Sequence, residues 1–427
     1  MSQMKEKIHE MKLDAPKMMT TPADLRNKAL LSIRDALLLK KEEIFVENAK
    51  DLSEAEKNKI PDAVKKRLKF DEKKLSDVVK GLEGLSELPD PVGRVTLHRQ
   101  LDEGLILKRV TCPIGVIGVI FEARPDALVQ ISALCIKSGN CAVLKGGKET
   151  TCTNRILFRL IRDAALGAGL PENCLMQAEQ HSEIDELLEC ETEVDLLIPR
   201  GSNAFVRYIM DHTKIPVMGH ADGVCHIYVG KSADREKAIR ILMDAKTQYT
   251  AACNAVETIL VHREIAEAFL PMLESECKAE GIKLRGTKEV CEMISGETME
   301  DQEFFTEYLS LTASVKLVSG VEEAADHINR YGSHHTDAIL TEDDEEAAYF
   351  MQMVDSAGVY RNCSTRFADG YRYGFGAEVG ISTGKLHARG PVGLDGLMTY
   401  KYELTGQGQI VGDYAEGKST FHFRDLE

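Results

Sequence analysis

The chain lacks the features that define several large classes of proteins. Its eleven cysteines, an odd number among 427 residues, include no Cys-x-x-Cys pair, which argues against a disulfide framework or a zinc ribbon and indicates a reducing compartment. No apolar run approaches the roughly eighteen residues of a membrane span. The segment after Met1 is polar and rich in lysine, without the apolar core of a secretory signal. We therefore expect a cytoplasmic protein that does not enter a membrane.

Positive charge is also scarce. The sequence has 53 Lys and Arg against 69 Asp and Glu, a formal net charge of −16, and its pI is about 5.3. An acidic chain without a basic stripe is a poor nucleic-acid binder, so nucleic acid is not an expected partner. Any anionic ligand must be held by local arginines, lysines and helix N-termini.

Two familiar phosphate-binding motifs are missing as well. No Gly-x-Gly-x-x-Gly follows an expected strand, and Lys145–Glu149 lacks the upstream glycine and downstream Ser or Thr of a Walker A loop. What is present is the turn Arg200–Asn203, between an expected strand and an expected helix. Backbone amides, the helix dipole and the Ser202 hydroxyl would converge there, and Gly201 would allow close approach. The turn is either an anion site or a capped helix with a surface arginine.

The order of apolar periodicities predicts an α/β protein of two or three domains. Thr20–Leu85 is helical in character, and residues 94–112 alternate around Asp102-Glu103-Gly104, which predicts a β-hairpin. Strands and helices then alternate as in parallel sheets covered on both faces. A second α/β unit is expected over about 236–400, and the tail 401–427 is expected to pair as an edge strand. The expected strands are 115–121, 141–145, 174–178, 194–198, 215–218, 225–229 and 256–261, and the expected helices are 126–137, 153–166 (ended by Gly167), one from Ser182 and one from Ser202.

One cysteine stands out by its surroundings. Cys253 lies among small residues in Tyr249–Thr258, between an amphipathic helical pattern and a β-branched strand. Small neighbours would let a substrate carbonyl and backbone amides approach the sulfur, as a thiolate nucleophile requires. The alternative is a buried structural cysteine, which is the usual role of a free cysteine.

Five stretches together resemble a known family. They occur in the family's order over nearly the whole chain, and they are similar to γ-glutamyl phosphate reductase (glutamate-5-semialdehyde dehydrogenase), a family of the aldehyde dehydrogenase superfamily. The stretches are 115–126 (GVIGVIFEARPD), 220–228 (HADGVCHIY), 249–258 (YTAACNAVET), 362–367 (NCSTRF) and 390–402 (GPVGLDGLMTYKY).

The resemblance implies an aldehyde dehydrogenase-like α/β fold with two parallel-sheet domains and a small oligomerisation element. The expected division is a cofactor domain at 1–93 and 113–226, a catalytic domain at 227–400, and an oligomerisation hairpin and tail at 94–112 and 401–427. The implied reaction is NADPH-dependent reduction of L-glutamyl 5-phosphate to L-glutamate 5-semialdehyde and phosphate in proline biosynthesis, through a thioester on Cys253. We expect a homo-oligomer, and a glutamate 5-kinase that supplies the acyl phosphate is a further expected partner.

The resemblance also assigns cofactor contacts. Lys145 corresponds to the ribose-binding lysine, and Gly201 with Ser202 corresponds to the pyrophosphate turn. Lys148 falls where NAD-preferring relatives carry an acid, and a cation there suits the 2′-phosphate of NADPH. Glu307 is the candidate for the nicotinamide ribose, although the Phe-Gly-Pro that usually follows is missing.

Two departures from hydrolytic relatives favour phosphate over water. His220 stands where those relatives have a glutamate base, and Ala123 where they have the oxyanion asparagine. The substrate carries a carboxylate and a phosphate, so Arg124 and Arg366 are the substrate-binding candidates, with Asn362 beside them. His220 would act in proton transfer or simply line the cleft.

Metal chemistry and other functions are weaker alternatives. Metal sites could be built from His334 and His335, or from His220, Cys225 and His226, but neither is a closed ligand set, so no metal is expected. The rival functions are an ordinary NAD(P)-dependent aldehyde oxidant, a cofactor-binding protein without activity, and a thiol hydrolase or acyltransferase.

Overall fold

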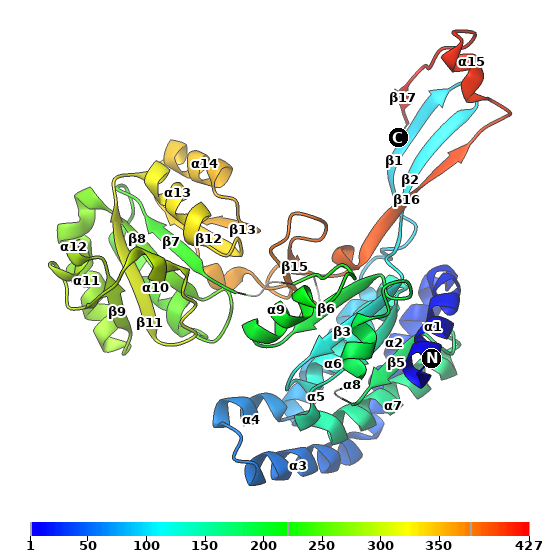
Figure 1. Ribbon diagram of the computed structural model, residues 1–427, viewed down its shortest axis with the longest axis horizontal. Coiled ribbons are helices and arrows are strands. Elements are labelled where there is room, and N and C mark those ends of the chain that lie inside the picture. The colour runs from blue at the N-terminus through cyan, green and yellow to red at the C-terminus, as the bar shows by residue number, and fades with distance from the viewer. Residues whose placement is uncertain (1, 181, 220–221, 376–377, 427) are drawn as a thin grey trace. The chain divides into compact units, whose positions relative to one another are not determined.

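The computed structural model describes residues 2–180, 182–219, 222–375 and 378–426. The chain forms two compact units. The first comprises residues 1–218, 375–380 and 392–427, and the second comprises 219–374 and 381–391. Figure 1 shows their elements coloured along the chain.

The first unit is built on a four-stranded parallel sheet in the order β5-β4-β3-β6. Its strands are apolar and buried along most of their length, as expected for a sheet covered on both faces. They are β3 (Val116–Phe121), β4 (Cys141–Lys145), β5 (Leu175–Ala178) and β6 (Leu196–Arg200). The predicted strand at 215–218 is wrong in extent, because that segment contributes only an isolated bridge between Leu197 and Val217.

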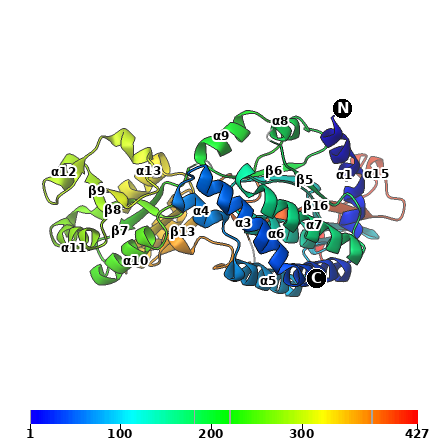
Figure 2. The ribbon, with the colours of Figure 1, turned by 90° about the horizontal axis from the view of Figure 1, so that it is seen from below.

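Helices surround this sheet. Helix α2 packs against α5, α6 and α7, and α3 packs against α7. Helices α3, α5, α6 and α7 are labelled in Figure 2. The helices are α1 (Gln3–Thr20), α2 (Ala23–Leu39), α3 (Lys41–Lys57), α4 (Asp62–Leu68), α5 (Glu72–Glu87), α6 (Pro125–Ser138), α7 (Thr151–Ala168), α8 (Ser182–Leu188) and α9 (Asn203–Asp211), with a 3₁₀ turn at Lys148–Thr150.

One helix end and one whole helix differ from the sequence prediction. Helix α7 continues through Gly167 and ends at Gly169, whose φ of 101° is left-handed and whose N–H donates to the carbonyls of Ala165 and Leu166. Helix α1 was not predicted, because its apolar stripe of Met4, Ile8, Met11 and Met18 is interleaved with many charged residues.

The predicted hairpin and the predicted pairing of the tail are both confirmed. Strands β1 (Val95–Asp102) and β2 (Leu105–Pro113) pair antiparallel around Gly104, and β16 (Met398–Thr405) and β17 (Arg424–Asp425) flank them in the order β16-β2-β1-β17. Figure 1 shows these segments, far apart in sequence, side by side in cyan and red, with α15 (Val411–Ala415) next to them.

The second unit contains a seven-stranded parallel sheet in the order β10-β9-β11-β8-β7-β12-β13. Its strands are β7 (Cys225–Val229), β8 (Val256–His262), β9 (Lys283–Gly286), β10 (Glu297–Thr298), β11 (Thr312–Val318), β12 (Thr336–Leu340) and β13 (Gly358–Arg361). Its helices are α10 (Arg235–Thr247), α11 (Ala266–Ala279), α12 (Lys288–Cys291), α13 (Val321–Tyr331) and α14 (Asp344–Met353).

Both faces of this sheet are covered. Buried side chains of α10, α11 and α12 form one core with one face of the sheet, and those of α13 and α14 form a second core with the other face. Short elements complete the chain: the two-stranded sheet of β14 (Gly380–Ser382) and β15 (Gly390–Val392), and 3₁₀ turns at Arg263–Ile265, Asp301–Phe305, Thr365–Phe367 and Asp395–Leu397.

The division into units corrects the expected domain boundary. The prediction ended the first domain at residue 226, but Cys225 begins β7 and pairs with Val256 of β8 inside the seven-stranded sheet. Residues 375–380 and 392–400 belong to the first unit instead of the second, since β16 begins at Met398 and pairs with β2. The functional roles assigned to the domains remain predictions.

Within the described residues, no helix combines the length and the apolar character that crossing a bilayer requires.

Candidate active site

The Cys253 loop lies at the amino edge of the seven-stranded sheet. Cys253 comes just before β8, Gly223 just before β7, and His335 just before β12. These strands are parallel neighbours in the order β8-β7-β12, so their first residues meet at one edge. Three segments distant in sequence thereby converge on one thiol.

The backbone of this loop is held from several sides. The Cys225 thiol donates to the Cys253 carbonyl at 3.3 Å, and the Thr365 hydroxyl donates to the Asn254 carbonyl at 2.7 Å. A Cβ at Gly223 would overlap the backbone of Cys253, so this close approach requires glycine. The loop is irregular but fixed, which is what a positioned nucleophile needs.

The thiol itself faces a histidine. His335 Nε2 lies 3.2 Å from Cys253 Sγ, and His335 Nδ1 lies 2.9 Å from the Thr336 hydroxyl. His335 is only 1% exposed, whereas Cys253 is partly exposed. Cys253 is therefore partly open to solvent, whereas the ring beside it is buried.

Nine of the other ten cysteines have thiols whose pKa is raised. Burial raises the pKa of Cys112, Cys135, Cys141, Cys152, Cys174, Cys190, Cys225, Cys277 and Cys363. A raised pKa keeps a thiol protonated and unreactive near neutrality.

A buried arginine stands near the same loop. Arg366 is 9% exposed, and its Nε donates to the Gln248 side-chain carbonyl at 2.9 Å. Burial, with help from Arg372, lowers the pKa of Arg366, while the Cys253 thiol acts in the opposite direction. The guanidinium and the thiol thus interact electrostatically, and the substrate role of Arg366 stays a prediction.

Asn362 does not join this group. Its amide nitrogen donates to the Thr341 carbonyl at 2.9 Å, and its amide oxygen accepts from the Thr341 N–H at 3.0 Å. Thr341 follows the last residue of β12, at the edge opposite Cys253. The predicted substrate role of Asn362 beside Arg366 is therefore not supported by this geometry, because both ends of the amide bond a strand terminus instead.

An ion pair is buried in the same unit. The Lys246 Nζ and Glu257 Oε2 atoms lie 2.6 Å apart, with both side chains at most 1% exposed. Burial raises the pKa of Glu257 to about 7, and Lys246 opposes this. Glu307 also raises the pKa of Glu257, which places Glu307 near the start of β8, although no contact in the structure tests its predicted ribose role.

The predicted cofactor residues of the first unit gather at one sheet edge. Lys145 ends β4, Lys148 follows it, and Gly201 and Ser202 follow β6. Arg124, a predicted substrate-binding residue, follows β3 at the same edge. The carboxyl ends of parallel strands are where α/β folds bind ligands. Lys148 is exposed and suits a solvent-facing phosphate.

Lys145 is more enclosed than Lys148. It is 4% exposed, and its Nζ donates to the Gly146 carbonyl at 2.7 Å. Burial lowers the pKa of Lys145, while Glu183, Glu149 and Glu179 oppose this. An ammonium among carboxylates suits hydroxyl groups better than a second anion.

The predicted pyrophosphate turn holds a carboxylate of the chain itself. The Ser202 N–H donates to Glu122 Oε2 at 3.1 Å, and a Cβ at Gly201 would overlap the same carboxylate. The Ser202 hydroxyl makes no capping hydrogen bond to α9, and its predicted role at a pyrophosphate stays a prediction. The turn favours an anion, and a pyrophosphate bound there would have to replace Glu122.

Two further predicted positions are less informative. Ala123 is buried and has a left-handed φ of 46°, and its methyl group offers no hydrogen-bond donor. His220 lies outside the described residues.

The histidines weighed for a metal site point to separate partners. His334 Nδ1 contacts the Asp355 carbonyl, His226 contacts Asp337, and His335 contacts Cys253. Among the residues that the structure describes, no three His, Cys, Asp or Glu side chains gather in an arrangement that could hold a metal ion.

The sequence analysis missed His335 as the partner of Cys253. Its only local signal was its place in residues 331–337 (YGSHHTD), immediately before an apolar segment. Which strand lies next to β7 and β8 cannot be read from that stretch, so the contact becomes visible only in the folded sheet.

Comparison with known proteins identifies the family and the fold of the chain. The model of the aldehyde dehydrogenase family matches residues 2–300. The fold also resembles that of a glyceraldehyde-3-phosphate dehydrogenase from Methanocaldococcus jannaschii complexed with NADP, with 17% identity, coverage of 95% of this chain and 94% of that one, and a TM-score of 0.66. The chain is thus an oxidoreductase of the aldehyde dehydrogenase class, which confirms the predicted fold.

Closer relatives narrow the class. A γ-glutamyl phosphate reductase from Pelotomaculum thermopropionicum is 55% identical over 403 residues, 94% of this chain and 93% of the relative. The crystal structure of a γ-glutamyl phosphate reductase from Thermotoga maritima is 35% identical, covers 96% of this chain and 100% of its own, and has a TM-score of 0.93. This chain belongs to the γ-glutamyl phosphate reductase family.

Proposed function

We propose that the chain reduces L-glutamyl 5-phosphate to L-glutamate 5-semialdehyde and phosphate with NADPH, through a thioester on Cys253. The overall reaction is that of its family, a step of proline biosynthesis. The observation that supports the thioester route is the partly exposed Cys253 thiol in a fixed loop against a buried imidazole.

The chemistry follows from the thiol. A Cys253 thiolate attacks the acyl carbon, and phosphate leaves without strong acid catalysis because it is a stable anion. Bound NADPH supplies a hydride to the acyl carbon. The resulting thiohemiacetal collapses to the aldehyde and frees the thiolate.

The substrate anions need cations. Arg366 lies within electrostatic reach of Cys253 in the second unit, and we assign it to one anionic end of the substrate. Arg124, at the carboxyl edge of the first unit's sheet, is the candidate for the other end. Bidentate hydrogen bonding makes arginine well suited to both carboxylate and phosphate.

The cofactor residues fit an anionic dinucleotide by their chemistry. We assign Ser202 and Gly201 to its pyrophosphate, Lys145 to a ribose and Glu307 to the nicotinamide ribose. Lys148 is exposed and can face a 2′-phosphate, which favours NADPH over NADH.

The reverse reaction tests the proposal. Oxidation of glutamate semialdehyde with NADP⁺ should depend on phosphate, or on arsenate, because a phosphate anion attacks the thioester without the glutamate base that water requires. The Cys253→Ser variant serves as the blank. Oxidation to free glutamate at an equal rate without phosphate would favour the aldehyde-oxidant alternative.

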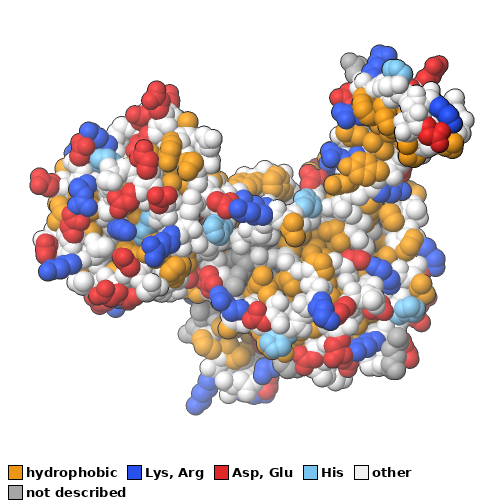
Figure 3. Space-filling model, turned by 45° about the horizontal axis from the view of Figure 1, so that its top comes forward, with side chains coloured by type: hydrophobic (Ala, Val, Ile, Leu, Met, Phe, Trp, Pro, Cys, Tyr) orange, Lys and Arg blue, Asp and Glu red, His pale blue; other side chains and the backbone are white. Residues whose placement is uncertain are grey.

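Assembly is a second part of the proposal. Tyr400, Tyr402 and Leu404 on β16, and Phe423 just before β17, are more than half exposed. Hydrophobic side chains are visible on this sheet in Figure 3. Exposed apolar groups on an unpaired sheet edge favour self-association, so we assign the sheet to a homo-oligomer contact. A Tyr402→Asp and Leu404→Asp double variant should sediment as a smaller species than the wild type. A glutamate 5-kinase as supplier of the acyl phosphate and a cytoplasmic location complete the proposal.

A further inference from the structure

Two further side chains, those of His335 and Thr336, lie one behind the other next to the Cys253 thiol. His335 presents Nε2 to the sulfur at 3.2 Å, and its other ring nitrogen is engaged by the Thr336 hydroxyl at 2.9 Å. A nucleophile, a base beside it and a third group that orients the base form the general arrangement of an activated nucleophile.

We propose that His335 is a catalytic residue that accepts the proton of the Cys253 thiol, and that Thr336 is the positioning residue that fixes the ring. In this arrangement His335 carries a hydrogen on Nδ1 and donates it to the Thr336 hydroxyl, which leaves Nε2 as the acceptor facing sulfur. The inference rests on the proposed function, because it names the base for the same thiol.

The proton balance of the reaction gives this pair a complete cycle. His335 Nε2 takes the thiol proton, the Cys253 sulfur bonds the acyl carbon, and the carbon–oxygen bond to phosphate breaks. The imidazolium then gives its proton to the departing phosphate, which leaves as hydrogen phosphate. After hydride transfer from NADPH the carbon–sulfur bond breaks, and the thiolate and neutral ring take one proton from solvent.

The surroundings of the pair distinguish it from ordinary packing. His335 is almost fully buried, yet its Nε2 faces the one reactive atom of the loop. The neighbouring His334 is more exposed and its Nδ1 bonds the Asp355 carbonyl at 2.6 Å. Two adjacent histidines thus have different environments, and His334 is a natural control.

Other charged groups act on the thiol at longer range. Arg366 interacts electrostatically with Cys253 and also favours a thiolate. The Cys225 thiol is buried, and burial raises its pKa well above its ordinary value, with further contributions from Asp337 and Cys253. Of these groups, His335 has a side-chain atom in hydrogen-bonding contact with the sulfur.

Alkylation of Cys253 by iodoacetamide tests the inference without turnover. The rate at Cys253 is followed by peptide mass spectrometry from pH 5 to 10 on the full chain. For the wild type we expect fast alkylation at pH 7. For His335→Gln, which is polar but cannot accept a proton, the rate at pH 7 should fall about tenfold or more and recover at pH 10, where hydroxide removes the thiol proton.

Control variants distinguish a role of His335 as a base from a role in supporting the structure of the loop. His334→Asn, which keeps a residue type that tolerates the left-handed φ of 59° at that position, should alkylate as the wild type does. Thr336→Val should lower the pH 7 rate by a smaller factor than His335→Gln, and it provides a second variant if His335→Gln fails to fold. An unchanged rate–pH profile in His335→Gln, or an equal loss at pH 7 and pH 10, would overturn the inference.

The outcome is distinguishable from failure of the proposed function. If Cys253→Ser retained semialdehyde oxidation while alkylation still depended on His335, the acid–base pair would stand and the thioester route would be wrong. If Cys253→Ser abolished oxidation but His335→Gln alkylated normally, the thioester route would stand and the pair would be wrong.

Discussion

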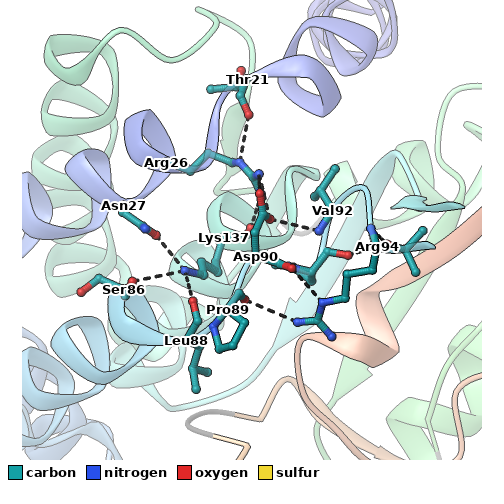
Figure 4. Close-up of polar contacts among 12 residues, drawn as sticks. Thr21, Arg26, Asn27, Ser86, Leu88, Pro89, Asp90, Val92, Arg94 and Lys137 are labelled. Carbon is teal, nitrogen blue, oxygen red and sulfur yellow. Dashed lines mark hydrogen bonds and ion pairs between the residues drawn. The ribbon is translucent and has the colours of Figure 1, made fainter. Parts of the chain in front are cut away.

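Each unit contains buried polar groups, but the two units use them in opposite ways. In the first unit, Lys137 of α6 is 2% exposed, and its ammonium donates to Asn27 Oδ1 at 2.8 Å, to the Leu88 carbonyl at 2.7 Å and to the Ser86 carbonyl at 3.3 Å. Figure 4 shows the three acceptors around the amine. Every ammonium proton thus has an acceptor.

Arg26 of α2 completes this cluster. Its Nη2 donates to both Asp90 oxygens at 2.9 and 2.7 Å, its Nε donates to the Thr21 carbonyl at 3.1 Å, and its Nη1 donates to the Lys137 carbonyl. The cations therefore tie α2, the end of α6 and the segment after α5 together. Burial lowers the pKa of Lys137, and Asp90 opposes this.

The Cys253–His335 pair of the second unit is more open to solvent. Cys253 is partly exposed, and its Sγ lies against His335 Nε2. A saturated cluster resists change and holds structure, whereas a thiol with one side open to solvent can meet a substrate. The comparison predicts that damage to the first cluster lowers stability, and that damage to the second lowers activity.

The largest effect is expected from the thiol itself. Cys253→Ser should reduce kcat by at least about a thousandfold, because a hydroxyl is a far weaker nucleophile than a thiolate. Its free energy of unfolding and its NADPH affinity should remain close to those of the wild type. The measurements are single-turnover kinetics, chemical denaturation and cofactor titration. Near-native activity in this variant would remove Cys253 from the active site.

The matching change in the first unit is Lys137→Met. It leaves three partly buried acceptors without a donor, so the free energy of unfolding should fall by about 2–4 kcal/mol. The folded fraction should keep the wild-type kcat. Denaturant titration and activity per folded molecule check both statements, and a matched Lys28→Met change on the exposed face of α2 should cost less than about 0.5 kcal/mol. A variant with full stability and low kcat would reverse the comparison.

The predictable parts of the molecule are those set by local sequence. The hairpin around Gly104 and the bounds of β4 follow from turn chemistry and from a short apolar run. Cys253 was found the same way, since its small neighbours are adjacent in sequence.

What could not be predicted depends on contacts distant in sequence. His335 and Cys253 are 82 residues apart, and Glu122 and Ser202 are 80 apart. Both contacts depend on which parallel strands become neighbours, and strand order is not set by any local pattern. Asn362 and Arg366 lie in the same family stretch, 362–367, but in the fold Asn362 bonds Thr341 after β12, whereas Arg366 bonds Gln248 after α10.

A third prediction contrasts a core histidine with the histidine of the pair. His327 is 4% exposed, and burial, aided by His226, Lys316 and Arg330, lowers its pKa to about 2 from an ordinary 6.5. Below pH 6.5 the unfolded chain binds a proton at this position that the folded chain does not. The contribution to stability is therefore intact above pH 6.5 and is lost as the pH falls.

The free energy of unfolding should fall by about 2 kcal/mol between pH 6.5 and pH 5, since each pH unit below the unfolded-state pKa costs about 1.4 kcal/mol. In His327→Leu the free energy of unfolding should fall less over the same interval, as measured by urea titrations at each pH. The exposed His212 of the first unit is the control, and His212→Asn should follow the wild type. Parallel curves for wild type and His327→Leu would contradict the prediction.

The smallest effect is expected at the cofactor edge of the first unit, where a cation is exposed and its interactions are screened. Lys148→Glu should raise the KM for NADPH about tenfold while changing the KM for NADH much less, because a carboxylate repels the 2′-phosphate that only NADPH carries. Raising the ionic strength should shrink this difference, since Lys148 is exposed and the Debye length falls with salt. The exposed Lys28→Glu change adds the same charge elsewhere on the unit and should leave both KM values unchanged. Equal weakening of the two cofactors by Lys148→Glu would place the 2′-phosphate contact at another residue, and it would remove the main structural argument for NADPH preference.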